Sequence, residues 1–258
     1  MLHSIDQFRR HTIQASDGDI GSVVDVWFDD EFWTIRYLVV DTGGWLSGRK
    51  VLLIPSVLGK ADWKTNRLPV QLTRKQVQES PGIDSDRPVS RQYEIELNAH
   101  YGWPAYWGGT EPLPTGMQPS VPMPPLRSQP SGAFRKEPGD RHLRSMRELQ
   151  NYRIHAVDGE IGHVDDFLVD DEQWDVRYLV VATRNWLPGR KVLISPRWLV
   201  GEISWARQAV NLIMNRESIR CSPEYDPSAP PDRAYENELE EHYRRAGFGG
   251  EDQTRKAA

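Results

Sequence analysis

The chain has 258 residues and a net charge of −5, and 38% of its residues are hydrophobic. This length suits two domains of about 100 residues each better than one. Apolar runs such as residues 37–40 are far shorter than the roughly 20 residues of a membrane-spanning helix, and the single cysteine, Cys221, excludes an internal disulfide. The N-terminus has neither the basic start nor the apolar stretch of a secretory signal. We therefore expect a globular, cytoplasmic protein.

The same unit occurs twice in the sequence. Residues 17–55 align without a gap with residues 158–196, at a constant offset of 141. Both copies contain the run Arg-Tyr-Leu-Val-Val, and both follow it with Trp-Leu-x-Gly-Arg-Lys-Val-Leu. The duplication predicts two domains of the same fold.

Each copy begins with short strands separated by turn residues. In the first copy we predict strands at residues 9–15, 20–28, 33–40, 50–54, 56–64 and 68–72. Pro55 ends the fourth strand, because proline cannot donate to a ladder. In the second strand, Val24, Val26 and Phe28 fall on one side by alternation. Strands of this length and spacing predict mainly β structure: two small antiparallel β-barrels, closed or partly open.

Two helical segments follow the strands in each copy. Thr73 is a good N-cap for a short helix over residues 73–81. Residues 93–101 place Tyr93, Leu97 and Tyr101 at helical spacing, which predicts a short amphipathic helix against the barrel. The second copy repeats this pattern with the motif Tyr-Glu-x-Glu-Leu.

These elements divide the chain into four parts. We predict a first barrel domain at residues 1–108, a linker at 109–140, a second barrel domain at 141–246 and a disordered tail at 247–258. The linker has eight prolines in 32 residues, a composition typical of extended, flexible segments. Such a linker permits both an intramolecular pseudo-dimer and two independent barrels, and association into a homodimer is a further alternative.

The repeated motifs resemble the PRC-barrel family. The resemblance is carried by Asp-Gly-[Asp/Glu]-Ile-Gly at residues 17–21 and 158–162, by the two motifs quoted above, and by the Tyr-Glu segment. The family is named for the cytoplasmic domain of the H chain of photosynthetic reaction centres, and a similar barrel occurs in a ribosome-maturation factor. The resemblance implies an all-β barrel that serves as a binding or assembly module, without a cofactor of its own. This chain lacks the membrane helix of the H chain and the separate N-terminal barrel of the maturation factor, so neither role transfers directly.

Paired acids follow the second strand of each copy, at residues 29–30 and 170–171. Paired carboxylates can bind Ca²⁺ or transfer protons. A hydrophilic turn explains them better, because the loop lacks the glycine-centred spacing of a calcium site.

His100 and His242 are the histidines that occupy equivalent positions, each four residues after a glutamate. One helical turn therefore separates each pair, which favours an ordinary charge pair over a metal site. Arg36 and Arg177 also recur, and we interpret each as a barrel arginine whose stem packs on the preceding tryptophan.

The strongest candidates for a contact surface are the two Trp-Leu-x-Gly-Arg-Lys loops. An aromatic ring, a glycine and two cations can hold phosphate, an aromatic ligand or a partner protein. A structural explanation competes, in which the tryptophan closes the barrel end and the cations face solvent. The candidate residues are Trp45, Gly48, Arg49, Lys50, Trp186, Gly189, Arg190 and Lys191.

These observations favour a non-catalytic tandem module that binds a protein partner or a macromolecular assembly. One alternative is an RNA- or ribosome-associated factor, in which the loop cations contact phosphates. Residues 1–108 carry 12 basic and 14 acidic side chains, and residues 141–258 carry 17 and 20, which argues against a general nucleic-acid surface. Another alternative is a peripheral partner of a membrane complex. We predict no catalytic residue, no metal site and no cofactor, because no nucleophile, base and oxyanion donor recur together.

Overall fold

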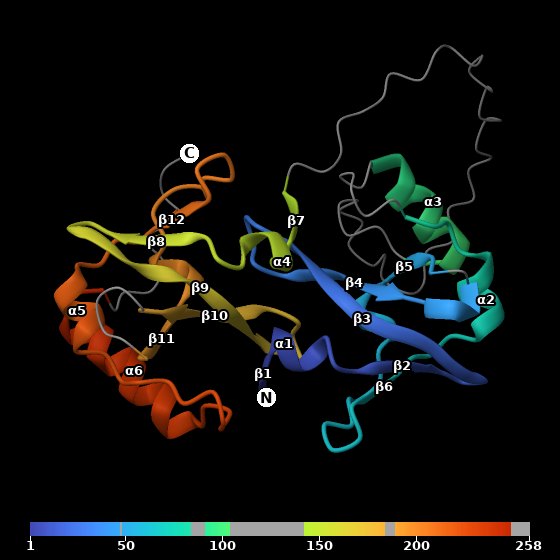
Figure 1. Ribbon diagram of the computed structural model, residues 1–258, viewed down its shortest axis with the longest axis horizontal. Coiled ribbons are helices and arrows are strands. Elements are labelled where there is room, and N and C mark those ends of the chain that lie inside the picture. The colour runs from blue at the N-terminus through green and yellow to red at the C-terminus, as the bar shows by residue number, and fades with distance from the viewer. Residues whose placement is uncertain (47, 84–90, 104–141, 184–188, 249–258) are drawn as a thin grey trace, which may run out of the picture.

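The computed structural model describes residues 1–46, 48–83, 91–103, 142–183 and 189–248, and it is mainly β (Figure 1). Two sheets of six strands each lie side by side, one for each repeat. Each sheet follows a path between two edge strands, so each repeat is a partly open barrel. The fold class expected from the sequence is therefore confirmed.

The first repeat places its own strands in the order β5-β4-β3-β2-β6. All neighbours on this path are antiparallel except β2 and β6, which are parallel. The elements are β2 (Thr12–Ala15), β3 (Gly18–Asp29), β4 (Ile35–Asp41), the 3₁₀ helix η1 (Gly43–Leu46), β5 (Lys50–Leu53), the 3₁₀ helix η2 (Pro55–Val57), β6 (Arg67–Pro69), α2 (Arg74–Glu79) and α3 (Arg91–Tyr101).

The second repeat has the corresponding order β11-β10-β9-β8-β12, with β8 and β12 parallel. Its elements are β8 (Arg153–Ala156), β9 (Gly159–Asp170), β10 (Val176–Ala182), β11 (Lys191–Ile194), the 3₁₀ helix η3 (Pro196–Trp198), β12 (Ala209–Asn211), α5 (Arg216–Arg220) and α6 (Arg233–Arg245). The short helices α2 and α5 begin where the sequence indicates. Thr73 caps α2 in a complete capping box, and Asn215 caps α5.

Three local predictions are wrong. Residues 56–64 form no strand: η2 begins at Pro55, whose fixed φ suits the first turn of a helix, and isolated bridges follow. Trp33 does not start β4 but lies in the preceding turn, with a φ of 57°. Val24 does not share a face with Val26, because β3 has a register shift between Val23 and Asp25, typical of a β-bulge.

A short arm before each repeat crosses to the other repeat. The first arm is β1 (Leu2–Ser4) with α1 (Ile5–Phe8), and β1 pairs with β9 of the second repeat. The second arm is β7 (Leu143–Ser145) with α4 (Met146–Leu149), and β7 pairs with β3 of the first repeat. Each sheet is thus completed by a strand from the other repeat.

The repeats also meet at their β3–β4 and β9–β10 turns. The amide of Ile35 donates to the carbonyl of Trp174 (2.7 Å), and the amide of Val176 donates to the carbonyl of Trp33 (2.8 Å). These two hydrogen bonds are equivalent under the 141-residue offset. One hydrophobic cluster runs through both repeats. Of the two arrangements that the linker permits, the structure has the intramolecular pseudo-dimer; the linker at 109–140 and the tail beyond Phe248 lie outside the described residues.

Candidate functional site

The two candidate loops lie far apart. Arg49 contacts the end of α2 and Arg190 the end of α5, and these helices stand at opposite ends of the molecule (Figure 1). Both glycines adopt positive φ, at 74° for Gly48 and 84° for Gly189. The side chain of Trp45 and all of residues 184–188, including Trp186, lie outside the described part of the chain.

Both loop arginines hold helix ends. Arg49 Nη1 donates to the carbonyl of Gln78 (3.2 Å), and Arg190 Nη1 donates to the carbonyl of Arg220 (2.7 Å). Arg190 Nη2 also donates to the carbonyl of Ser222. A guanidinium at a helix C-terminus satisfies carbonyls that have no partner within the helix. These contacts give both arginines a structural role.

The loop lysines also form contacts within the fold. Lys191 Nζ lies 2.6 Å from Asp165 Oδ2, and about a third of each side chain is exposed. Lys50 begins β5 and forms an isolated backbone bridge with Ile83. Whether these loops bind anything stays a prediction.

The acidic turns have two separate functions in the fold. Asp29 Oδ1 accepts the amides of Glu31 and Phe32 (both 3.0 Å), and Asp170 does the same in the second repeat. The first acid therefore closes the turn, as the hydrophilic-turn interpretation requires. Asp29 also pairs with Arg36 (3.1 Å), whereas Arg177 is exposed.

The second acid of each turn binds the arm of the other repeat. Asp30 lies 2.9 Å from His142 Nδ1, and Asp171 lies 2.7 Å from the amino group of Met1. The hydrogen bond to Asp30 raises the pKa of His142. The hydrogen bond to Asp171 likewise raises the pKa of the Met1 amine. Equivalent carboxylates thus anchor both arms through different cations.

A further pair of carboxylates holds the arms, and sequence reasoning missed their role. Asp25 accepts the Ser145 hydroxyl (2.6 Å) and the Arg147 amide (3.3 Å), both from the second arm. Asp166 accepts the Ser4 hydroxyl and the Asp6 amide from the first arm. The available signal was a serine before a short helix in each arm, at the same 141-residue offset as the two aspartates.

The repeated histidines attach the last helix of each repeat. His100 Nε2 lies 2.9 Å from the carbonyl of Gln76, and His242 Nε2 lies 2.7 Å from the carbonyl of Ser218. Each ring therefore connects the last helix to the short helix before it. The interpretation of His100 and His242 as charge-pair partners of the preceding glutamates missed these contacts.

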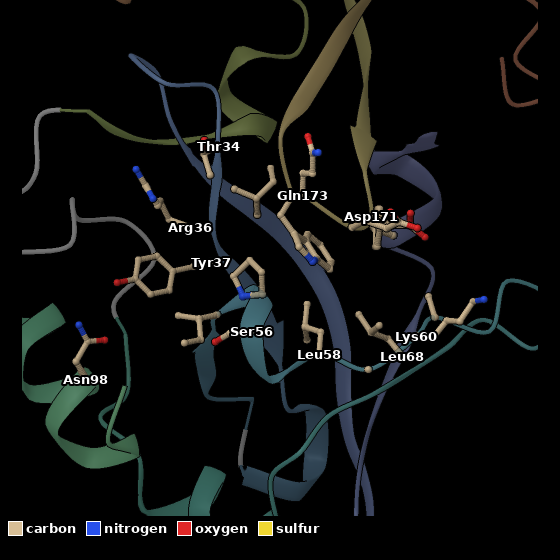
Figure 2. A pocket seen from close by; sticks show the side chains of 18 residues that line it. Thr34, Arg36, Tyr37, Ser56, Leu58, Lys60, Leu68, Asn98, Asp171 and Gln173 are labelled. Carbon is tan, nitrogen blue, oxygen red and sulfur yellow. The ribbon is translucent and has the colours of Figure 1, made fainter. Parts of the chain in front are cut away.

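A groove with a volume of about 770 Å³ lies at the junction of the two repeats (Figure 2). Its floor is apolar and includes Ile35, Pro55, Leu58 and Trp174. Trp174 belongs to the second repeat, and its carbonyl is bonded to the first repeat through Ile35. This volume lies within the usual range for ligand sites, about 300–1,000 Å³. Of the predicted contact residues, those whose side chains the structure describes do not line the groove.

Polar side chains stand at the two ends of the groove. Figure 2 shows Asn98, from α3, at one end and Lys60 at the other, with Leu58 between them. Asn98 is only 7% exposed, yet its side-chain amide has no hydrogen-bond partner among the described residues. Lys60 is exposed and has no ion-pair partner within the same part of the chain.

The equivalent positions of the second repeat are filled differently. Ser56 corresponds to Arg197, and Asn98 corresponds to Glu240. Arg197 Nη2 and Glu240 Oε1 form an ion pair at 2.7 Å. The pair bridges η3 and α6 at the place where the first repeat is hollow.

The described residues contain no group of three or more His, Cys, Asp or Glu side chains that could hold a metal ion. Within the same part of the chain, no helix is both long and apolar enough to cross a membrane.

Two matched, partly open barrels with exchanged arms define a tandem all-β module. The family model for the PRC-barrel domain matches residues 4–77 and 144–209, and the chain belongs to this family. PRC-barrel domains are generally protein-interaction modules and generally not catalytic. A search of curated proteins found no match.

Proposed function

We propose that the protein is a non-catalytic adaptor that binds a partner protein across the junction of its two repeats. The observation that supports this function is the groove, which both repeats line: β4 and η2 come from the first, and Trp174 comes from the second. Neither repeat alone could build it. The exchange of arms is consistent with a binding surface at the junction, because the arms hold the two repeats, and therefore the two walls of the groove, in a fixed relative position.

Site-specific photo-crosslinking in the native cell tests this function. A photoreactive residue at Ser56 is expected to form a covalent adduct with one partner protein. The same residue at Arg197, the equivalent position of the second repeat, is the matched control and is expected to give little of that adduct. Absence of any specific adduct from Ser56, with the protein folded and expressed, would contradict the proposal.

The two Trp-Leu-x-Gly-Arg-Lys loops are a separate proposed contact. Their positions at opposite ends of the molecule suit a partner, or two copies of one, that contacts both repeats, with a gain in avidity. Replacing Trp45 and Trp186 by alanine would then reduce recovery of the cross-linked partner. Unchanged recovery would remove the loops from the interface while leaving the groove.

A further inference from the structure

We propose that the groove binds an extended peptide segment of the partner, with an apolar residue at its centre and an acidic residue at the end near Lys60. This inference rests on the proposed function and specifies its ligand. It is carried by three features: an apolar floor, the amide of Asn98, which lines the groove and has no side-chain hydrogen bond to another described residue, and an exposed cation.

The floor provides the apolar anchor. Trp174 is held in place from both sides: its amide donates to the carbonyl of Asp170 (2.8 Å), and its carbonyl accepts the amide of Ile35 (2.7 Å). Its ring also packs beside Phe8, with the ring centroids 5.5 Å apart. A fixed aromatic ring loses little conformational entropy when a ligand covers it, which is the property of an interface anchor.

Asn98 matches a peptide group. A primary amide presents one acceptor and two donors, and a peptide bond presents the complementary carbonyl and N–H. Because Asn98 lines the groove, its amide can form hydrogen bonds with a ligand that enters it. A backbone passing over Asn98 would satisfy it. An extended segment exposes its backbone groups in this way, whereas a helix bonds them internally.

The charges at the other end of the groove favour an acidic residue. Asp171 also lines this end, but its carboxylate is bound by the Met1 amine (2.7 Å). Arg36 on the opposite wall is paired with Asp29. Lys60 therefore offers an exposed cation to an incoming side chain, although Glu172 also lines the groove and reduces its positive charge.

The second repeat supplies the variant that tests this inference. Ser56→Arg with Asn98→Glu copies the Arg197–Glu240 pair into the groove, and the fold already accommodates that pair in the second repeat. Arg197→Ser with Glu240→Asn is the matched control. Both double variants should keep the thermal unfolding transition of the parent chain.

The probe is a phage-displayed library of random dodecapeptides, panned against the full chain. An enriched peptide, resynthesised with a fluorescent label, is expected to bind at least about tenfold more weakly to the filled groove, a change of about 1.4 kcal/mol. Binding to the control variant should be unchanged. Failure to enrich an apolar sequence with an acidic residue, or equal binding to the filled groove, would overturn the inference. A synthetic peptide of residues 110–130, from the linker of this chain, is tested in the same way. If it binds the groove better than the enriched peptides, the occupant is the linker and not a partner, which would also overturn the inference.

A charge exchange tests the role of Lys60. Lys60→Glu should weaken binding of the acidic peptide, and replacing the peptide's acid by lysine should restore it. No effect of either change would refute the acidic specificity. The outcomes also separate this inference from the proposed function: if the groove of the parent chain binds no peptide in any form while the adduct from Ser56 persists, the adaptor function stands and the peptide model is wrong.

Discussion

At the end of β5 the first repeat places Ser56 opposite Asn98, whereas the second repeat places Arg197 against Glu240 at 2.7 Å. The strands on either side have the same order and nearly the same register in both repeats. The difference between the repeats at this position therefore lies in the side chains and not in the order of the strands. Duplication supplied two equivalent positions, and an ion pair bridges one of them.

The packing of the core next to this position also differs between the two repeats. Trp198 is only 2% exposed and packs against Tyr243 in a tilted arrangement, with ring centroids 4.3 Å apart, while its counterpart is the smaller Val57. In the first repeat, Trp103 instead stacks on Tyr101, the counterpart of Tyr243. Each repeat thus covers the same tyrosine with a tryptophan from a different element.

The largest effect should come from a glycine that both repeats require. A Cβ at Gly21 would lie 1.9 Å from the carbonyl oxygen of Asp41, and a Cβ at Gly162 would lie 1.9 Å from that of Ala182. We expect Gly21→Ala and Gly162→Ala each to lower the free energy of unfolding by more than about 4 kcal/mol. Because the arms are exchanged, each variant should unfold in one transition, measured by calorimetry.

Gly44→Ala is the control, since its added Cβ meets nothing within 4 Å. Two separate unfolding transitions in Gly21→Ala or Gly162→Ala would show that the repeats fold independently, and this would contradict the exchange of arms.

Trp198→Val tests the difference in packing between the repeats. The substitution removes a buried ring and should lower the free energy of unfolding by about 3 kcal/mol. Val57→Ala at the equivalent position should cost about 1.5 kcal/mol, because it removes two methyl groups. Chemical denaturation measures both, and equal losses would mean that the ring contact with Tyr243 adds nothing.

The arm contacts offer the next comparison. Asp25 accepts four hydrogen bonds, from the Val26 amide, the Trp27 indole, the Ser145 hydroxyl and the Arg147 amide. Asp25→Ala should therefore lower the free energy of unfolding by about 2–3 kcal/mol. It should also increase hydrogen exchange in β7, with little change in β1. Uniform exchange in both strands would argue against a local anchor.

Asp166, the counterpart of Asp25, should give the protein a distinct pH dependence. Burial raises the pKa of Asp166 to about 6. A carboxyl whose pKa is raised on folding binds a proton more readily in the folded state, so its contribution to stability increases as the pH falls through about 6. When the pH is lowered from about 7 to about 5, the free energy of unfolding of the parent chain should increase by about 1 kcal/mol relative to that of Asp166→Asn. An equal pH response of both proteins would be the contrary result.

The smallest effect on stability should come from the pH dependence of the two ion pairs that anchor the arms, His142 with Asp30 and Met1 with Asp171. The pKa of His142 is raised by Asp30, so its stabilising charge is present below the ordinary value of about 6.5 and is lost as the pH rises through the raised pKa. The loss should be below about 1 kcal/mol, since the ring is half exposed. Hydrogen exchange of the Asp30 amide, which bonds the His142 carbonyl, should rise first.

The first arm provides the internal control for this measurement. The pKa of the Met1 amine is raised above 8.0, so its ion pair with Asp171 should persist to a higher pH than that of His142. Exchange of the Asp171 amide, which bonds the Met1 carbonyl, should therefore rise only at higher pH. Simultaneous loosening of both arms would show that the two cations do not set their stability.

The sequence predicted what depends on neighbours along the chain. The repeated Tyr-Leu-Val-Val run lies buried in β4 and β10, and the helix over residues 93–101 buries Leu97 as its spacing predicts. Thr73 caps its helix because its hydroxyl needs only the amide three residues later. Family membership followed from the same local motifs.

Local signals failed where the backbone departed from a regular pattern. Period-two alternation places Val24 beside Val26 only in a strand without a bulge. Composition could not show that Trp33 would adopt positive φ, because its turn is stabilised by Asp29 and by the other repeat.

The exchange of arms and the groove were decided by the tertiary structure alone. Each arm strand has three residues, too few to carry a pattern, and its partner strand lies in the other repeat. The groove joins β4 to Trp174 over more than half the chain, and its lining includes Ser56 and Asn98, which form no motif. Periodicity reports which face of an element is buried; it does not report which distant surface buries it or where two surfaces leave a space between them.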